Sequence, residues 1–294
     1  MKRIVLMLAL MAATIFSASA EEKTKTYDFG DIKSLNVGYC YQVHVTEGNS
    51  GKVKVEYDSK FEDYMKVRYN SDAKGLSITM SDNLPKKMIV GKEPRIHVYL
   101  EMNEISRLDL SGACNVTFEG DYRSDELDID LSGASRLTQL NIKGKSLDIE
   151  CSGASKCSLT GDFHNDVDMD VSGASNLYYE GNSKELNAEI SGASRLQCIG
   201  NYDKVDTECS GASKLCLEGT ADNAEFDGSG ASSIEAKNFV VKDVKLALNG
   251  ASKADVNATG SLTYNVGRAS KIIYYGDAIL KNVSTDSNVV RGRL

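Results

Sequence analysis

The tetrapeptide Ser-Gly-Ala-Ser, or a close variant of it, returns along this 294-residue chain at near-constant intervals. The first residues of successive copies lie 18 to 21 positions apart, and a fainter tenth copy begins at Ser284. Self-similarity at one period of about 20 residues indicates a stack of similar structural units, which limits the possible folds more than any other feature of the chain. The nine clear copies begin at Ser111, Ser132, Ser152, Ser172, Ser191, Ser210, Ser229, Asn249 and Gly267.

Apolar residues alternate with polar ones around each tetrapeptide. Leu147, Ile149 and Cys151 precede the third copy, and Cys157 follows it. A period of two predicts strands with one buried face, so each unit is predicted to be strand, corner, strand and turn. One such unit cannot bury its own apolar face, whereas stacked units can when their strands pair in parallel. The sequence therefore predicts an all-β fold, a right-handed parallel β-helix solenoid of about ten coils.

The tetrapeptide is interpreted as the corner at which every coil turns, with a multivalent binding motif as the alternative. Glycine supplies a positive φ or a close approach of backbones. Alanine is expected to fit beneath the tight corner, and the serines to hydrogen-bond to corner backbone and along the stack. The copy at Gly267 places Arg268 where glycine is expected, so that corner should differ or shift by one residue. The corner glycines are Gly112, Gly133, Gly153, Gly173, Gly192, Gly211, Gly230 and Gly250.

These features resemble one known family. The repeated corners, the β-rich entry YCYQVHVTEGNSGKVKVEY and the closing KIIYYGD are similar to the auto-transporter adhesin head domain of GIN type. The resemblance extends over roughly Tyr27 to Leu294. It implies a β-helical protein exported by bacteria, mostly Bacteroidetes, with an adhesive or surface-interaction role. It supplies no catalytic residues that could be carried over to this chain.

Three segments are expected along the chain. Residues 1–20 combine a basic start, an apolar stretch and Ala18-Ser19-Ala20, which is typical of a cleaved secretory signal peptide. In residues 21–106, apolar and polar residues alternate, but the tetrapeptide is absent. They are expected to form an irregular β-rich cap and first coils, because an open solenoid end invites aggregation. A separate small β domain is the alternative for them. Residues 107–294 are expected to form the repeat solenoid, and the protein is expected in the periplasm or at the cell surface.

Net charge limits the possible partners. The chain carries a formal charge of −8, and loss of Lys2 and Arg3 with the leader would make it −10. This argues against nucleic acid and anionic lipid, and it permits cationic partners and divalent metal ions. No segment is long and apolar enough to suggest a membrane span, and no cofactor is expected. The predicted partner is a surface or envelope ligand that the sequence does not identify, and the oligomeric state is left open.

Carboxylates recur at fixed positions of the repeat and define the main candidate site. In seven successive coils, a carboxylate lies two positions before the tetrapeptide. Several of these coils have a second carboxylate four positions before it. If the coils stack, neighbours in a column lie about 5 Å apart and repel each other, and cations across the corner are expected to relieve part of this. A solvated face that blocks sheet stacking is one interpretation. The other is a weak calcium lattice that includes Asp128, Asp130, Asp148, Glu150, Asp168 and Asp170.

Tyrosines and cysteines give weaker signals. Alternation places one ring of Tyr178-Tyr179 and one of Tyr274-Tyr275 outward, so Tyr178 and Tyr275 are candidate binding residues, with a corner-covering role as the alternative. Most of the seven cysteines fall on apolar positions and are expected to act as small buried hydrophobes. Cys151 and Cys157 flank one corner and can approach each other.

The sequence favours a binding protein over an enzyme. The three histidines neither repeat nor occur in a known motif, and the tetrapeptide is not a Gly-x-Ser-x-Gly elbow. The even spacing leaves no room for the long loops that build a cleft. We therefore expect an exported, non-catalytic protein with an adhesive or surface-binding role. The alternative is a structural or regulatory envelope protein without an external ligand.

Overall fold

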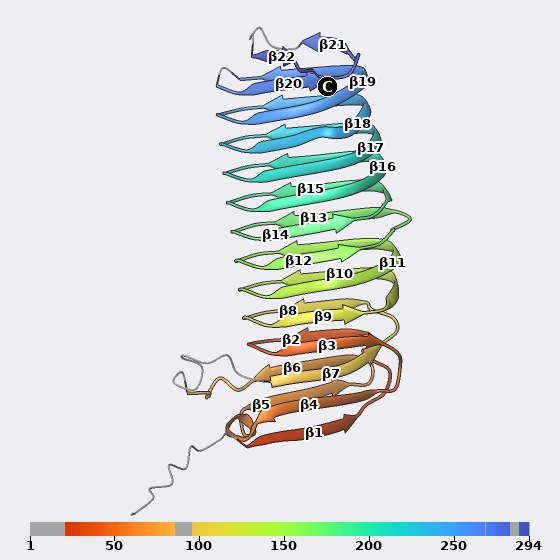
Figure 1. Cartoon of the computed structure of the whole chain (residues 1–294), viewed down its shortest axis with the longest axis vertical. Coiled ribbons are helices and arrows are strands. Elements are labelled where there is room, and N and C mark those ends of the chain that lie inside the picture. Colours follow the sequence, from red (N-terminus) through yellow and green to blue (C-terminus); the bar gives the residue numbers. More distant parts are fainter. Residues whose placement is uncertain (1–20, 86–95, 268, 283–287, 294) are drawn as a thin grey trace, which may run out of the picture.

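The computed structural model describes residues 21–85, 96–267, 269–282 and 288–293. These residues form an elongated all-β stack without an α-helix, in which each coil follows a sharp corner on one side and a rounded bend on the other (Figure 1). All the strands belong to one 22-stranded sheet that wraps around a common core. The predicted parallel β-solenoid is confirmed.

Each coil contributes one strand to each of two faces. Strands that lead into the sharp corner form the entry face, and strands that leave it form the exit face. Several strands are long because they continue through the rounded bend from the exit face to the entry face of the next coil. These are β11 (Arg136–Cys151), β16 (Arg195–Cys209), β17 (Lys214–Gly228), β18 (Ser233–Leu248) and β19 (Lys253–Val266). β10 (Asp121–Leu131) begins at the bend and continues onto the entry face.

The remaining strands of the repeats are shorter and belong to one face each. On the entry face they are β8 (Arg107–Leu110), β13 (Asp166–Val171), β15 (Ser183–Ile190) and β21 (Ile279–Asn282). On the exit face they are β9 (Asn115–Glu119), β12 (Lys156–Thr160), β14 (Asn176–Glu180), β20 (Lys271–Tyr275) and β22 (Val289–Arg291). Strands of successive coils pair in parallel, so equivalent positions of the repeat form straight columns along the stack.

The sharp corner is a turn built around its glycine. The eight corner glycines have φ between +70° and +79°, whereas none of the corner alanines has a positive φ. With the hydrogen bond from Ser232 N–H to Ser229 O, these signs match a type II′ turn, which takes glycine at its second position. The fourth residue points inward, and its hydroxyl closes the turn, as Ser135 Oγ does by donating to Ser132 O at 2.9 Å.

The expected role of the corner alanine is wrong. Ala134 and its equivalents are exposed, because the second and third residues of the turn project at the outer apex of the corner. The buried residue of the motif is the final serine, for example Ser155, which also donates to Ser175 Oγ of the next coil at 3.3 Å. The variant corner at Gly267 is not shifted in frame, since Gly267 N–H donates to Leu248 O as the other first residues do. Arg268 and the start of the tenth copy lie outside the described residues.

The rounded bend is held by side chains that hydrogen-bond from coil to coil. Asn182 Nδ2 donates to Asp162 Oδ1 at 2.7 Å, Asn201 Nδ2 to Asn182 Oδ1 at 2.9 Å, and Thr220 Oγ1 to Asn201 Oδ1 at 2.7 Å. Such a ladder satisfies amide groups that the bend removes from regular strand pairing. Sequence analysis did not anticipate it, because its members share one position, ten residues after the start of a tetrapeptide, but are not one residue type.

The first complete coil precedes the tetrapeptides. It consists of β2 (Ser34–Val37), a corner at Gly38–Tyr41 and β3 (Gln42–Glu47), and it lies directly beneath the coil of β8 and β9. Tyr39 occupies the position of the corner glycine with φ of 87°. The Tyr41 hydroxyl donates to Thr79 O at 2.9 Å, which ties this corner to the coil below.

The order of coils in this region differs from the order of the chain. Strands β6 (Gly75–Met80) and β7 (Ile96–Met102) lie beneath β2 and β3, although they follow them in sequence (Figure 1). Below them, pairing becomes antiparallel, with β5 against β6, β4 against β7 and β1 against β4. The bounds of these elements are β1 (Glu22–Asp28), β4 (Lys52–Asp58), the 3₁₀ turn η1 (Ser59–Phe61) and β5 (Met65–Asn70).

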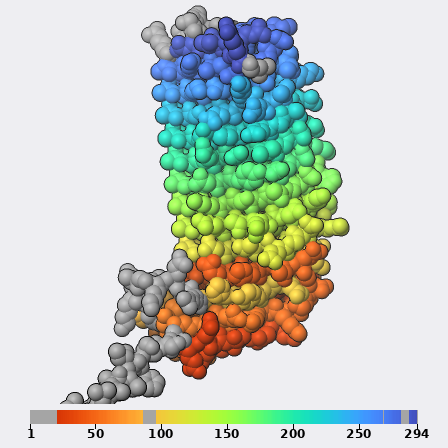
Figure 2. Space-filling view, in the orientation of Figure 1, coloured from red at the N-terminus to blue at the C-terminus, as the bar shows by residue number. Residues whose placement is uncertain are grey.

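The core is one continuous cluster between the two faces. Inward columns along the stack are buried from Leu35 in the first coil to Ile272 near the last. Each coil stacks flat on the next, and Figure 2 shows the molecule as successive layers. In the described part of the chain, no helix is long and apolar enough to cross a membrane.

Candidate functional site

An unbroken column of carboxylates runs along the entry face. Its members occupy the position two residues before the corner and pair in register from coil to coil, so each faces the next across one strand spacing, about 4.8 Å. All are exposed or half-buried. We call them the outer acidic column: Asp109, Asp130, Glu150, Asp170, Glu189, Glu208 and Asp227.

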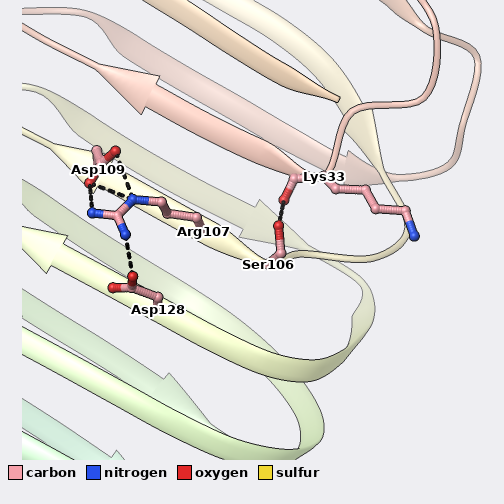
Figure 3. Close-up of polar contacts among 5 residues, drawn as sticks. All are labelled: Lys33, Ser106, Arg107, Asp109 and Asp128. Atoms are coloured by element: carbon pink, nitrogen blue, oxygen red, sulfur yellow. Dashed lines mark hydrogen bonds and ion pairs between the residues drawn. The ribbon is translucent and has the colours of Figure 1, made fainter. Parts of the chain in front are cut away.

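A second column lies beside it, two residues earlier along each strand. In stack order its members are Arg107, Asp128, Asp148, Asp168, Asn187, Asp206, Glu225 and Lys245, and we call it the inner column. Cations therefore stand at both ends of its acidic stretch. Arg107 pairs with Asp109 at 3.0 Å and with Asp128 (Figure 3). Lys245 pairs with Glu225 at 3.3 Å.

Ionised carboxylates in the middle of the two columns repel each other. Partial burial raises the pKa of Asp130, and the neighbouring Asp109 raises it further. Burial likewise raises the pKa of Asp148, which stands between Asp128 and Asp168. A raised carboxyl pKa means that the charged form is less stable in the folded protein than in the unfolded chain. This penalty is present at neutral pH and disappears as the pH falls through the folded-state pKa.

The cations beyond the corner do not relieve this repulsion, contrary to expectation. Lys214 pairs with Glu235, and Lys253 with Asp255 at 3.0 Å, all on the exit face. The physical reason is that the corner turns the chain back on itself, so outward side chains before and after it project from opposite faces. Where ion pairs are found in the acidic columns, Arg107 and Lys245 at the ends supply them.

A shallow groove lies beside the half of the outer acidic column that is nearer the C-terminal end. It has a volume of about 360 Å³ and lies between that column and the first serines of the corners. Asp170, Glu189, Glu208 and Asp227 line one side, and Ser191 and Ser210 belong to the other. Within the described ranges, no group of three or more acidic, histidine or cysteine side chains is arranged around a common point that could hold a metal ion.

The two candidate tyrosines lie on the exit face. Tyr179 is fully buried, and Tyr178 points outward and donates from its hydroxyl to Glu180 Oε2 at 2.8 Å. Tyr275 is half-buried, with Lys237 Nζ 4.8 Å from its ring centre. Five coils separate Tyr178 from Tyr275, about 24 Å at strand spacing. The column that starts at Tyr178 continues through Gln197, Cys216, Glu235 and Asp255 to Ile273, and Tyr275 lies two residues beyond Ile273 on the same strand.

A second groove of about 320 Å³ occupies the exit face between these tyrosines. It forms where the pairing of β17 and β18 shifts register between Cys216 and Glu218, so that the face is no longer flat. Basic side chains, Arg195 and Lys237, and acidic side chains, Glu235 and Asp255, line it together. Polar side chains of both signs suit a polar ligand that offers donors and acceptors. The corner spacing changes here from 19 to 20 residues, but it does not place the extra residue on the exit face, so the groove is not apparent from the sequence.

The sequence matches the family described as "Putative auto-transporter adhesin, head GIN domain" over residues 31–181 and 167–278. These two segments together cover most of the chain. The chain belongs to this family. The resemblance inferred from the corners is thereby confirmed, and no curated protein matches this GIN-domain chain.

Solved structures support the fold of this GIN-domain protein. A "putative adhesin" from Parabacteroides distasonis is 15% identical, with a TM-score of 0.57, and the match covers 92% of this chain and 97% of the other. A "putative adhesin" from Parabacteroides merdae is 14% identical over 92% and 93% of the two chains, with a TM-score of 0.46. A "Putative lipid binding protein" from P. distasonis is 16% identical over 92% and 94%, with a TM-score of 0.47. The first of these shows a shared fold.

The GIN-domain chain also carries an aromatic row that sequence analysis did not anticipate. On the exit face of the first coils, the His44 ring lies 5.0 Å from Tyr99 and 5.9 Å from His97, with nearly parallel planes. Lys54 Nζ lies 5.4 Å from the centre of the Tyr99 ring. His164 lies elsewhere, at the rounded bend, where its Nδ1 is 2.8 Å from Gly144 O. No repeat signal links these residues, because they come from the segment before the tetrapeptides.

Removal of one central charge should stabilise the entry face. Asp148→Asn keeps the shape of the side chain and removes a partly buried charge between two others, so we expect the free energy of unfolding to rise by about 0.5–1 kcal/mol at low ionic strength. The gain should shrink in sodium chloride, which screens the same repulsion. Urea melts at two salt concentrations measure it, with Lys143→Gln as the control that removes an exposed positive charge.

The same protein tests the calcium hypothesis for Asp128, Asp130, Asp148, Glu150, Asp168 and Asp170. Bound calcium would stabilise the folded state by mass action, beyond the effect of ionic strength. Because the columns do not converge on a point, we expect calcium chloride and sodium chloride at matched ionic strength to shift the wild-type melting temperature equally. A calcium-specific rise that disappears when Asp148, Asp168 and Asp170 become Asn would contradict this expectation.

Proposed function

We propose that this protein is exported and acts by binding, as an adhesive or surface-interaction element without catalytic activity. The observation that carries the proposal is that equivalent outward side chains of successive coils are aligned in register. The parallel coils repeat the same outward position along both faces, with one strand spacing between copies. Such a rigid, flat array suits contact with an extended or repetitive partner. Membership of a family described as an adhesin head domain supports the same conclusion.

The exit face between Tyr178 and Tyr275 is the proposed contact surface. Arg195, Glu235 and Asp255 line the groove there. Tyr178 pairs with Gln197 of its lining, and Tyr275 lies beside Lys237 of its lining. An amphipathic ring beside paired charges can contact a sugar or a peptide. The acidic entry face is proposed to keep the molecule dispersed, because like charges on its exposed columns oppose stacking of one solenoid face on another.

Binding is tested with purified residues 21–294 on a printed panel of glycans and extracellular-matrix proteins. We expect at least one probe to bind, and Tyr178→Ala combined with Arg195→Ala to weaken that binding at least tenfold. Thr138→Ala is the matched control, because Thr138 occupies the same position of the repeat two coils earlier. Equal binding by the double variant and the wild type would show that the contact surface lies elsewhere on the molecule.

Location separates the adhesive role from its alternative, a structural or regulatory envelope protein. An adhesive protein must be reachable from outside, so we expect protease to cleave it on intact cells of the source organism. Protection until the outer membrane is permeabilised, together with no bound probe on the panel, would favour the envelope role. A leader ending at Ala20 is part of the proposal, and the N-terminal sequence of the cell-derived protein tests it directly.

A further inference from the structure

Two cysteines face each other across one corner in the middle of the stack. Cys151 is the last residue of β11, and Cys157 is the second residue of β12. The corner of residues 152–155 and Lys156 separate them along the chain. Both side chains point inward, with exposed fractions of 1% and 3%, and both are free thiols.

The corner brings these two positions of the repeat into contact. At the equivalent pair four coils nearer the C-terminal end, a Cβ added to Gly228 would lie 3.6 Å from Ile234 Cδ1. The thiols of Cys151 and Cys157 interact directly, and this contact, with burial, raises the pKa of Cys157. Other coils place two hydrophobic residues here, such as Leu131 with Leu137. Cys209 has the same position as Cys151, but it faces Leu215.

We propose that Cys151 and Cys157 form a disulfide across the corner. In the reaction, a thiolate of one cysteine attacks an external disulfide, and the second cysteine then displaces the mixed disulfide. One sulfur–sulfur bond forms in the protein, the external disulfide is reduced to two thiols, and the two cysteine protons pass to them. The oxidant is a small-molecule or protein disulfide of the kind present in the oxidising compartments to which proteins are exported. The occurrence of the bond in cells therefore rests on the proposed export.

The bond should form while the chain folds. In the folded protein both thiols are inaccessible, and a buried thiol with a raised pKa yields little of the thiolate that exchange requires. Before the corner packs, only five residues separate the cysteines, so their encounter is easy. Once the coils have stacked above and below, the same burial protects the bond from reduction. We infer a structural bond that is fixed during folding rather than a reversible sensor.

Refolding in a glutathione redox buffer tests the bond without any ligand or cell. Reduced, denatured residues 21–294 are refolded with oxidised and reduced glutathione, and the remaining thiols are alkylated and counted by mass. We expect five of the seven cysteines to be alkylated and the unlabelled mass to fall by about 2 Da, because two hydrogens leave. Trypsin cleaves after Lys156, so the peptides that contain Cys151 and Cys157 should stay joined until a reductant is added.

Variants distinguish this pair from the other cysteines. Cys157→Ser should leave six alkylated thiols and no joined peptides, whereas Cys209→Ser should keep the bond. Leu215→Cys places a second cysteine opposite Cys209 across the corner that starts at Ser210, and we expect a second disulfide there. The oxidised wild type should also melt several degrees above its reduced form.

Seven alkylated cysteines after refolding, or a bond from Cys151 to any cysteine other than Cys157, would overturn the inference. Neither outcome bears on the binding face, since the groove between Tyr178 and Tyr275 is tested with the probe panel. A protein that binds its probe but never forms the bond would therefore separate the two proposals.

Discussion

Gly173→Val should lower the free energy of unfolding by roughly 2–6 kcal/mol, through backbone strain and overpacking together. Gly173 has φ of +72°, a conformation that β-branched residues avoid. A Cβ added there would lie 2.6 Å from Gly153 O of the coil below. That carbonyl accepts from Ala174 N–H at 2.7 Å, so the clash would also break the bond that joins the two corners.

Ala174→Val is the matched control, because it adds the same side chain one residue later. Ala174 is exposed at the apex and does not have a positive φ, so we expect a loss well below 1 kcal/mol. Both variants are compared by urea denaturation followed by circular dichroism. Equal midpoints would show that the corner does not depend on its glycine.

The repeat made the solenoid and its columns predictable, for one physical reason. Parallel pairing at a constant period places equivalent residues of each coil on top of one another, so spacing alone fixes which residues are neighbours. The carboxylates from Asp109 to Asp227 were assigned to one column in this way, and strand pairing confirms that arrangement. Inward positions followed equally from the period of two, as with Ile149 and Met169, which are buried.

Features that break the repeat were not predictable. Tyr39 takes the glycine position of the first corner, where no tetrapeptide marks it, and that coil lies above strands that come later in the chain. The alanine was assigned to the wrong side of the corner, because the tetrapeptide itself does not reveal which of its residues project outward. The exit-face groove depends on a register shift near Cys216. The corner spacing lengthens there from 19 to 20 residues, but the spacing alone does not show where in the coil the extra residue lies.

Thr207→Val should stabilise the protein by about 1–2 kcal/mol, which is unusual for a core substitution. Thr207 is 1% exposed, and its Oγ1 is buried with no hydrogen-bond partner among the residues that the structure describes. Equivalent positions in neighbouring coils carry Ala188 and Phe226, both apolar. Valine has nearly the same shape, so it removes the cost of the unpaired hydroxyl without opening a cavity.

The same substitution at Thr220 should have the opposite sign. Thr220 Oγ1 donates to Asn201 Oδ1 at 2.7 Å in the ladder of the rounded bend, so Thr220→Val should lose about 0.5–1.5 kcal/mol. Urea denaturation of the two variants beside the wild type measures both changes. Destabilisation of both by similar amounts would mean that the Thr207 hydroxyl has a partner in solution, such as a buried water, whose removal offsets the gain. Opposite signs would show that coil stacking, rather than polar bonding, holds the centre of this solenoid, while the bend depends on its hydrogen bonds.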